Sequence, residues 1–289
     1  MLAMKRLVMI FSLVISSAVA PAAFAQCFWG QSPAAVAFGT YQTFAGGGNT
    51  SNTSGAVTCT GAYTFTVKIS QGGSGSYTPR KMNNLANYNI YVDPTLATIY
   101  GDGTNGTFQY ITANGSGTNS YSGTVYGNAP AGQDLAPGAY TDSLIATLSY
   151  KLTNGTGGTT TQPGVTIPVS MTVISECRVD TFNLTFGPYN PFTVTALAQT
   201  SQVKVYCTKT TPATLSLDNG VNSSGAQKRM ISGGASYLNY TATLATTAAT
   251  STSSLIPLGG GITLNGTVPA SQDVKVGSYI DTLQVLVNY

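Results

Sequence analysis

The chain contains the same set of sequence landmarks twice, in the same order. The first copy reads Cys27, Phe38-Gly39-x-Tyr41, Cys59, Arg80-Lys81-Met82, Gly123-Thr124-Val125 and Gly138-x-Tyr140-x-Asp142-Ser143-Leu144. The second copy reads Cys177, Phe186-Gly187-x-Tyr189, Cys207, Lys228-Arg229-Met230, Gly266-Thr267-Val268 and Gly277-x-Tyr279-x-Asp281-Thr282-Leu283. In both copies, 20 positions separate the glycine of the Phe-Gly pair from the second cysteine, and 23 separate that cysteine from the methionine. The chain must therefore fold as two similar units.

The first 25 residues have the pattern of a secretory signal peptide. Lys5 and Arg6 are basic, residues 7–15 are apolar, and Ala-Phe-Ala at 23–25 forms a small-residue cleavage site. The apolar run is too short to span a bilayer. We expect residues 1–25 to be removed and the mature chain, which has no membrane span, to be exported.

All four cysteines lie in the exported part, two in each copy. Four cysteines allow three pairings, and the duplication selects Cys27–Cys59 and Cys177–Cys207. Each bridge would close a loop of roughly 30 residues and stabilise the fold by about 3–4 kcal/mol through the unfolded state. The chain has no histidine, and the cysteine spacings match no zinc pattern. We expect no metal site and no cofactor.

Charged residues are scarce. Without Lys5 and Arg6 the chain has ten basic and nine acidic residues, a net charge of +1. Charged residues make up 7% of the chain, whereas about 25% is usual. No basic patch or stripe is present in the sequence, so nucleic acid is not an expected partner. A surface built from hydroxyls and amides suits an extracellular β-protein that packs closely against its neighbours.

Apolar and polar residues alternate along short segments, which is the period of a half-buried strand. Such segments are Tyr63–Ile69 and residues 144–148, 203–207, 215–217 and 283–287. No segment has a sustained helical stripe. Strands at intervals of about ten residues are typical of a β-sandwich. We therefore expect an all-β protein of two tandem sandwiches.

The two copies end differently. The last shared strand of the first copy ends at Tyr150, and a Gly/Thr-rich loop then leads to a further alternating strand, Val165–Val173. The apolar positions of this candidate donor-type strand are Val165, Ile167, Val169, Met171 and Val173. The second copy ends its last shared strand at Tyr289, and a sandwich that lacks a strand exposes unpaired backbone edges. We expect residues 165–173 to complete the first domain; the alternative is that they serve the second.

The landmarks resemble those of the spore coat protein U domain family, which occurs in subunits of archaic (Csu-type) chaperone–usher pili. The resemblance covers both halves of the mature chain. It rests on the paired cysteines, the Phe-Gly-x-Tyr motif, the Arg/Lys-Met element before Tyr88 and Tyr240, and the Gly-x-Tyr-x-Asp-[Ser/Thr]-Leu ending. The first copy also has Tyr-Gly-Asp-Gly at 100–103, close to the aromatic-Gly-Asp-Gly of the family, whereas the second has Leu-Gly-Gly-Gly at 258–261.

The resemblance implies immunoglobulin-like sandwiches, with a C-terminal domain that lacks its last strand. A periplasmic pilus chaperone would lend this strand, and the next pilin subunit would replace it during assembly at an outer-membrane usher, by β-strand addition. The implied domains are a signal peptide at 1–25, an N-terminal receptor-binding adhesin domain at 26–175, and a C-terminal pilin domain at 176–289.

A strand that the chain itself donates would need about ten residues before the first domain. Cys27 is the second residue after the expected cleavage, so we expect a subunit that accepts a strand but donates none. Such a subunit would be a tip adhesin, exported through the periplasm to the cell surface, which mediates biofilm formation and attachment to an abiotic or host surface. The alternative is a structural spore-coat or pilus shaft subunit without receptor binding.

An enzyme is not expected, and no catalytic residue is predicted. Without histidine there is no Ser-His or Cys-His pair, and Glu176 is the only glutamate. Asp142 and Asp281 occupy equivalent positions, which indicates a shared structural role in a turn or a backbone bond. Asp93 and Asp102 are candidate turn residues.

Apolar side chains in predicted loops are the candidate surface-binding residues. They are Phe28, Trp29, Pro94, Leu96, Ala97, Pro130, Leu135 and Pro137. Tip subunits of the Csu type use hydrophobic loop tips on abiotic surfaces, so the resemblance implies that these loops contact the target. The alternative is a lectin-like, carbohydrate-binding head, in which tyrosine or tryptophan side chains stack on sugar rings.

Overall fold

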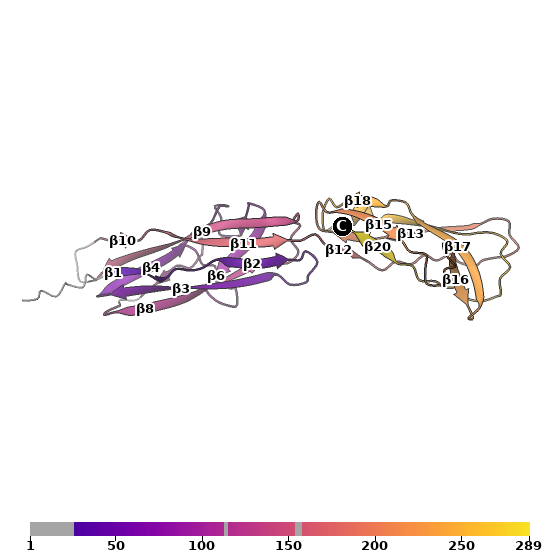
Figure 1. Cartoon of the computed structure of the whole chain (residues 1–289). Helices are drawn as coiled ribbons and strands as arrows, with labels where there is room; N and C mark the ends of the chain where they lie inside the picture. Colours follow the sequence, from indigo (N-terminus) through magenta and orange to yellow (C-terminus); the bar gives the residue numbers. More distant parts are fainter. Residues whose placement is uncertain (1–25, 113–114, 154–157) are drawn as a thin grey trace, which may run out of the picture.

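A computed structural model describes residues 26–112, 115–153 and 158–289. Two β-sandwiches lie end to end, strands β1–β11 in the first and β12–β20 in the second (Figure 1). The predicted signal peptide lies outside the described residues. Within the described ranges, no helix is long and apolar enough to cross a membrane. The expected all-β class with two tandem sandwiches is confirmed.

The first sandwich consists of two sheets, ordered β1-β3-β8-β6-β5 and β2-β11-β9-β4-β7, with β10 beside β9. Its strands are β1 (Gln26–Gln31), β2 (Val36–Tyr41), β3 (Asn49–Thr60), β4 (Tyr63–Ile69), β5 (Arg80–Met82), β6 (Ala86–Tyr91), β7 (Tyr110–Ile111), β8 (Asn119–Ala129), β9 (Gly138–Leu152), β10 (Thr160–Thr161) and β11 (Val165–Val173). The core between the sheets is fully enclosed around Tyr41, Met82 and Leu144, which are each 0% exposed.

Strand β11 completes the first sandwich. It runs antiparallel to β9 over nine residue pairs, from Val165 opposite Ala146 to Val173 opposite Gly138. On its other side it runs parallel to β2, with Val169 beside Val36. Its apolar positions 167, 169, 171 and 173 are at most 2% exposed. The strand therefore belongs to the first sandwich and does not serve the second.

The second sandwich has sheets ordered β13-β19-β17-β16 and β18-β15-β20, and the pair β12-β14. Its strands are β12 (Cys177–Val179), β13 (Leu197–Val203), β14 (Val205–Cys207), β15 (Pro212–Leu217), β16 (Lys228–Ser232), β17 (Ser236–Leu244), β18 (Ala248–Thr250), β19 (Ile262–Val268) and β20 (Val285–Asn288), with one 3-10 turn, η1 (Leu258–Gly260). A second core cluster forms around Val203, Leu264 and Val268, all 0% exposed.

The two disulfides join Cys27 to Cys59 and Cys177 to Cys207. Each links residues that face one another in an antiparallel pair, β1 with β3 and β12 with β14. The pairing that the repeat predicts is therefore present in both sandwiches.

One predicted landmark pairing is wrong. The true counterpart of Gly266 is Gly127, not Gly123. A Cβ atom at Gly127 would lie 3.1 Å from the Phe38 ring, and one at Gly266 would lie 2.8 Å from the Phe186 ring. Both glycines leave room for the aromatic ring of the Phe-Gly motif, and this long-range contact is not visible in the Gly-Thr-Val letters.

Candidate strand-acceptor groove

A groove of about 780 Å³ runs along the second sandwich. Its two walls are residues 182–191 and 274–283, and Met230, Leu238 and Tyr240 lie between them. By the repeat, the first wall corresponds to β2 and the second to the beginning of β9. These are the two strands between which β11 lies in the first sandwich. The groove therefore occupies the position of the strand that the second sandwich lacks.

The walls of the groove are extended chain without a strand ladder. Residues 180–196 and 281–284 contain no assigned strand, although their counterparts in the first sandwich are β2 and the first part of β9. In the described part of the chain, no backbone hydrogen bond joins residues 184–189 to another strand. The second wall is bonded on one side only, as where Ile231 donates its N–H to the carbonyl of Ile280 at 2.9 Å. The alternation at 283–287 predicted a strand, but without a partner the strand begins only at Val285.

Equivalent side chains are less buried where the strand is missing. Phe38 is 5% exposed and Leu144 is 0% exposed, whereas Phe186 and Leu283, their counterparts, are half-buried. Among the described residues, the core of the second sandwich has fourteen apolar residues that are only partly buried, and the two core clusters of the first sandwich have six. Apolar groups left in contact with water cost about 25 cal/mol per Å². Among the described residues, the groove therefore contains apolar groups that would gain from being covered.

Both sandwiches anchor the Gly-x-Tyr-x-Asp segment in the same way. Tyr88 donates a hydrogen bond to Asp142 at 2.6 Å, and Tyr240 donates one to Asp281 at 2.7 Å. Asp281 also accepts the backbone N–H of Asn222 at 3.1 Å. Burial and the carboxylate acceptor raise the pKa of Tyr240 well above its usual value. The predicted structural role of the two aspartates is confirmed, and the bond holds the groove wall in place without β11.

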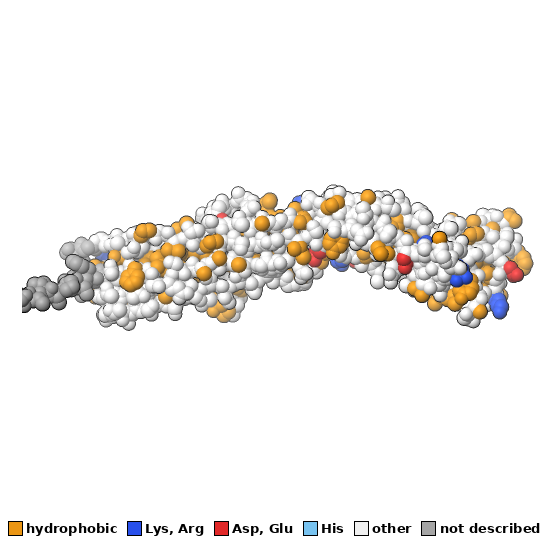
Figure 2. Space-filling model, viewed as in Figure 1, with side chains coloured by type: hydrophobic (Ala, Val, Ile, Leu, Met, Phe, Trp, Pro, Cys, Tyr) orange, Lys and Arg blue, Asp and Glu red, His pale blue; other side chains and the backbone are white. Residues whose placement is uncertain are grey.

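The groove side of the second sandwich is rich in exposed apolar side chains. Phe192 is 93% exposed, and Val194, Val276 and Ile280 are also exposed. Figure 2 shows apolar side chains gathered on the second sandwich toward the end away from the first. Exposed apolar patches of this kind mark contact sites for other chains. Sequence patterns missed these residues because their exposure depends on the absence of a neighbouring strand.

The family model described as the Spore Coat Protein U domain matches residues 13–147 and 164–286. The chain belongs to the Spore Coat Protein U domain family. The first matched segment ends within β9, and the second begins just before β11 of the first sandwich and continues through the second sandwich. The family model matches twice, so the repeat in the sequence is a repeat of this domain. No curated protein matches the chain.

Solved structures similar to this Spore Coat Protein U domain chain include a chaperone–tip subunit complex and a tip adhesin. A chain of the chaperone–tip adhesion subunit pre-assembly complex from archaic Csu pili of Acinetobacter baumannii is 19% identical, with a TM-score of 0.47. That match covers 91% of this chain and 100% of the other. The CupB6 tip adhesin from Pseudomonas aeruginosa is 10% identical, with a TM-score of 0.36 over 91% of this chain and 94% of the other.

The two ends of the first sandwich differ in their surroundings. At the outer end, Gln26 faces Thr60, and Tyr63 faces Leu152. The opposite end contacts the second sandwich through Asp134, which accepts hydrogen bonds from the backbone N–H and the hydroxyl of Ser254, both at 2.8 Å. Among the described residues, the contacts with the second sandwich therefore lie at the Asp134 end and not at the outer end.

The loop that contains Pro130, Leu135 and Pro137 lies at this joint. Leu135 is only 7% exposed and packs in the first core. The prediction that Leu135 is an exposed contact residue is therefore wrong. The alternation of β8 places Ala129, the last residue of that strand, in the core. The loop that follows then covers the end of the core, where Gln133 donates its N–H to Tyr41 Oη at 2.9 Å.

Phe28 and Trp29 lie on β1, toward the outer end, but their side chains differ in exposure. Phe28 is 41% exposed. Trp29 is half-buried and packs against the core cluster around Leu144 and against a further cluster of the same sandwich that contains Phe65 and Leu148. Since successive strand residues point to opposite faces, only Phe28 presents its ring to solvent. Ile111 of β7, 57% exposed, is a further exposed apolar residue that the sequence patterns missed.

Asp93 organises the turn that holds Pro94, Leu96 and Ala97. Its carboxylate accepts the backbone N–H groups of Thr95, Ala97 and Thr98 at 3.0–3.2 Å. These bonds, with that of the Thr95 hydroxyl as the largest contribution, lower the pKa of Asp93. Asp102 accepts the N–H and hydroxyl of Thr104 in the same manner. The two predicted turn residues are confirmed.

Proposed function

We propose that the chain is a pilus subunit of the chaperone–usher type, and that its second sandwich, residues 176–289, accepts a donor strand. The observation that carries this proposal is the contrast between the two repeats. Strand β11 lies between β2 and β9 in the first sandwich, and a groove of about 780 Å³ lies at the same place in the second. A strand from a periplasmic chaperone, and later from the next subunit, would fill the groove by β-strand addition.

The energetics of β11 indicate what such a strand contributes. Full burial of one Val, Ile or Met side chain is worth about 1.5–3 kcal/mol, and β11 buries four. The sum, about 6–12 kcal/mol as an upper estimate, is comparable to the whole stability of a domain. The second sandwich is therefore expected to depend on its partner strand for stability.

We assign the adhesive role to the first sandwich, residues 26–175, as the head of a tip subunit. Because β11 already fills its groove, this sandwich cannot take part in strand exchange and is free to contact a target. Its exposed apolar residues Phe28 and Ile111 support attachment to apolar surfaces, and the turn at 94–97 is a third candidate contact. Attachment of this kind would promote biofilm formation.

Strand acceptance is tested with a peptide that carries residues 163–175 of this chain. Added to the full-length protein, the peptide should bind with one-to-one stoichiometry and raise the unfolding temperature of the second sandwich. The control peptide has serine at positions 167, 169, 171 and 173 and should not bind. Equal behaviour of the two peptides would refute the acceptor role.

Adhesion is tested separately on cells that display the assembled pilus. Replacing Phe28 and Ile111 together by serine should reduce attachment to an apolar surface and leave pilus assembly unchanged. Leu85→Ser is the matched control, because Leu85 is 63% exposed but lies in the turn between β5 and β6, away from the outer end. Unchanged attachment by the double variant would contradict the head assignment to these residues.

A further inference from the structure

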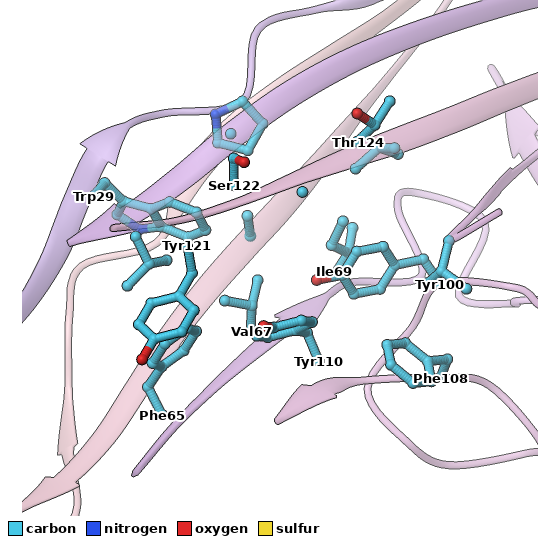
Figure 3. A pocket seen from close by; sticks show the side chains of 17 residues that line it. Trp29, Phe65, Val67, Ile69, Tyr100, Phe108, Tyr110, Tyr121, Ser122 and Thr124 are labelled. Carbon is cyan, nitrogen blue, oxygen red and sulfur yellow. The ribbon is translucent and has the colours of Figure 1, made fainter. Parts of the chain in front are cut away.

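A pocket of about 330 Å³ lies inside the first sandwich, apart from the groove. Figure 3 shows aromatic side chains around it. Its ring-bearing lining residues are Trp29, Phe65, Tyr100, Phe108, Tyr110 and Tyr121. Phe65 stacks on Tyr110 with the ring centroids 5.6 Å apart. The pocket is therefore a predominantly aromatic space between the two sheets.

A glycine leaves this space open. Gly55 of β3 faces Gly123 of β8 in the strand register. Pro33 packs on Gly55, where an added Cβ atom would lie 2.8 Å from Pro33 Cγ. Gly123 shares the inner face of its strand with Tyr121 and Val125, yet a Cβ atom added at Gly123 would meet nothing within 4 Å. Glycine inside a strand can mark a bulge, a bend, or the close approach of a ligand or another backbone. At Gly123 the inner face of the sheet lacks a side chain where a core normally has one.

The second repeat fills the same place. With the offset that aligns the cysteines, Gly55 corresponds to Val203, and the facing residue is Ile262. Val203 is 0% exposed and Ile262 is 2% exposed. The ring-bearing Trp29 and Phe65 correspond to Val179 and Ala213. The aromatic pocket is therefore a property of the first sandwich and is not required by the fold.

The pocket has an entrance. Strand β6 pairs with β8 only at residues 126–128, so among the described residues no strand pairs with this edge of β8 at 119–125. Phe108, which lines the pocket, is 39% exposed. The indole Nε1 of Trp29 is buried, so Trp29 contributes the apolar part of its ring to the pocket.

We propose that the pocket binds an aryl group of one or two rings. A dry cavity of about 150 Å³ is enough for benzene, so about 330 Å³ has room for a larger ring system. Aromatic walls prefer flat rings in stacked or edge-to-face contact. The volume is within the range of small-molecule sites, about 300–1,000 Å³.

The test uses the full chain and its single tryptophan, which lines the pocket, so a ring bound there lies close enough to quench it. Nitrobenzene, which is aromatic and quenches indole fluorescence, should quench Trp29 with a saturable curve. Nitromethane, which has the same quenching group without a ring, should quench only in proportion to its concentration. A strictly proportional curve for nitrobenzene would overturn the proposal.

Two variants locate the site. Gly123→Ile places the side chain of the second repeat in the pocket and should weaken nitrobenzene binding by about tenfold or more, equivalent to about 1.4 kcal/mol. Ser120→Ile, on the outer face of the same strand, should bind like the unmodified protein. Equal affinity of the two variants would contradict the proposed site. If Gly123→Ile does not fold, as judged by circular dichroism, the methyl NMR signals of Val57, Val67 and Ile69 in the unmodified chain decide: they must shift with nitrobenzene, and unshifted signals would refute binding.

Discussion

Val169 of β11 lies beside Val36 of β2, in a parallel pairing that closes the core of the first sandwich. In the second sandwich, Leu184 is the counterpart of Val36, and its side chain is half-buried and lines the groove. The two repeats thus present one fold in two states, with the strand site occupied in the first and open in the second. This difference leads to predictions that compare equivalent residues.

The first prediction compares the phenylalanines of the Phe-Gly motif. Phe38→Ala should lower the free energy of unfolding of the first sandwich by about 3–5 kcal/mol, because it leaves a cavity in a closed core. Phe186→Ala should cost less than half of this in the second sandwich, since the Phe186 ring is already partly in contact with water. Urea unfolding of both variants measures the difference. Equal costs would contradict the view that the second core is open.

A second prediction concerns the joint between the sandwiches. Burial alone would raise the pKa of Asp134, but the hydrogen bonds from Ser254, together with Lys209 at 3.8 Å, lower it below 3.8 overall. A carboxylate whose pKa is lower in the folded protein than in the unfolded chain stabilises the joint fully at pH values above the unfolded pKa. This stabilisation is lost as the pH falls through the pKa of the folded protein. We therefore expect the joint to be closed at neutral pH and to loosen below about pH 3.8.

Asp134→Ala tests the joint at neutral pH. Amide exchange at Ser254, whose N–H is bonded to Asp134, should become about two- to tenfold faster, since a hydrogen bond is worth about 0.5–1.5 kcal/mol net. Phe44, which donates its N–H to Glu176 at 2.9 Å, provides a second contact that the variant leaves intact. Unchanged exchange at Ser254 would show that Asp134 does not hold the joint.

A third prediction concerns the disulfides. Replacing Cys27 and Cys59 together by serine should cost about 3–4 kcal/mol of stability, because the closed loop no longer restricts the unfolded chain. Since Trp29 follows two residues after Cys27, its fluorescence should shift to the red as β1 loosens. The matched variant of Cys177 and Cys207 should destabilise the second sandwich and leave the Trp29 emission unchanged. A red shift in the matched variant would contradict this assignment.

Much of the fold could be predicted from the sequence, because local patterns determine it. Period-two alternation gave Tyr63–Ile69 with the bounds that the structure has, and the repeat identified both cysteine pairs. The loop before Val165 led to the prediction that residues 165–173 complete the first sandwich, and β11 does so. Each of these signals depends on residues near one another or on a direct comparison of the two copies.

The site was harder to predict because burial depends on distant strands. Leu135 is in a turn-like sequence, but its side chain packs in the first core. Trp29 and Phe28 are adjacent aromatic residues, and the difference in their exposure comes from the face of β1 to which each points. The Gly55–Gly123 pair was invisible until the register of β3 and β8 placed the two glycines opposite one another. Residues 184–189 have a strand-like sequence, and only the missing partner keeps them from forming a ladder.

The central claim is that the second sandwich lacks one strand and that an equivalent of β11 completes it. The most direct test appends residues 151–175 of this chain after Tyr289, the counterpart of Tyr150, so that the native loop and strand follow the second repeat. A control has the same extension with serine in place of Ile167, Val169, Met171 and Val173.

Hydrogen–deuterium exchange of residues 184–189 and 277–283 is the decisive measurement. If the account is correct, these amides, except that of Ile280, whose N–H is already bonded to the carbonyl of Ile231 at 3.1 Å, exchange rapidly in the unmodified chain and in the control, and become strongly protected in the extended variant. Protection in the unmodified chain equal to that of the extended variant would show that the groove is already closed, and would contradict the strand-acceptor account.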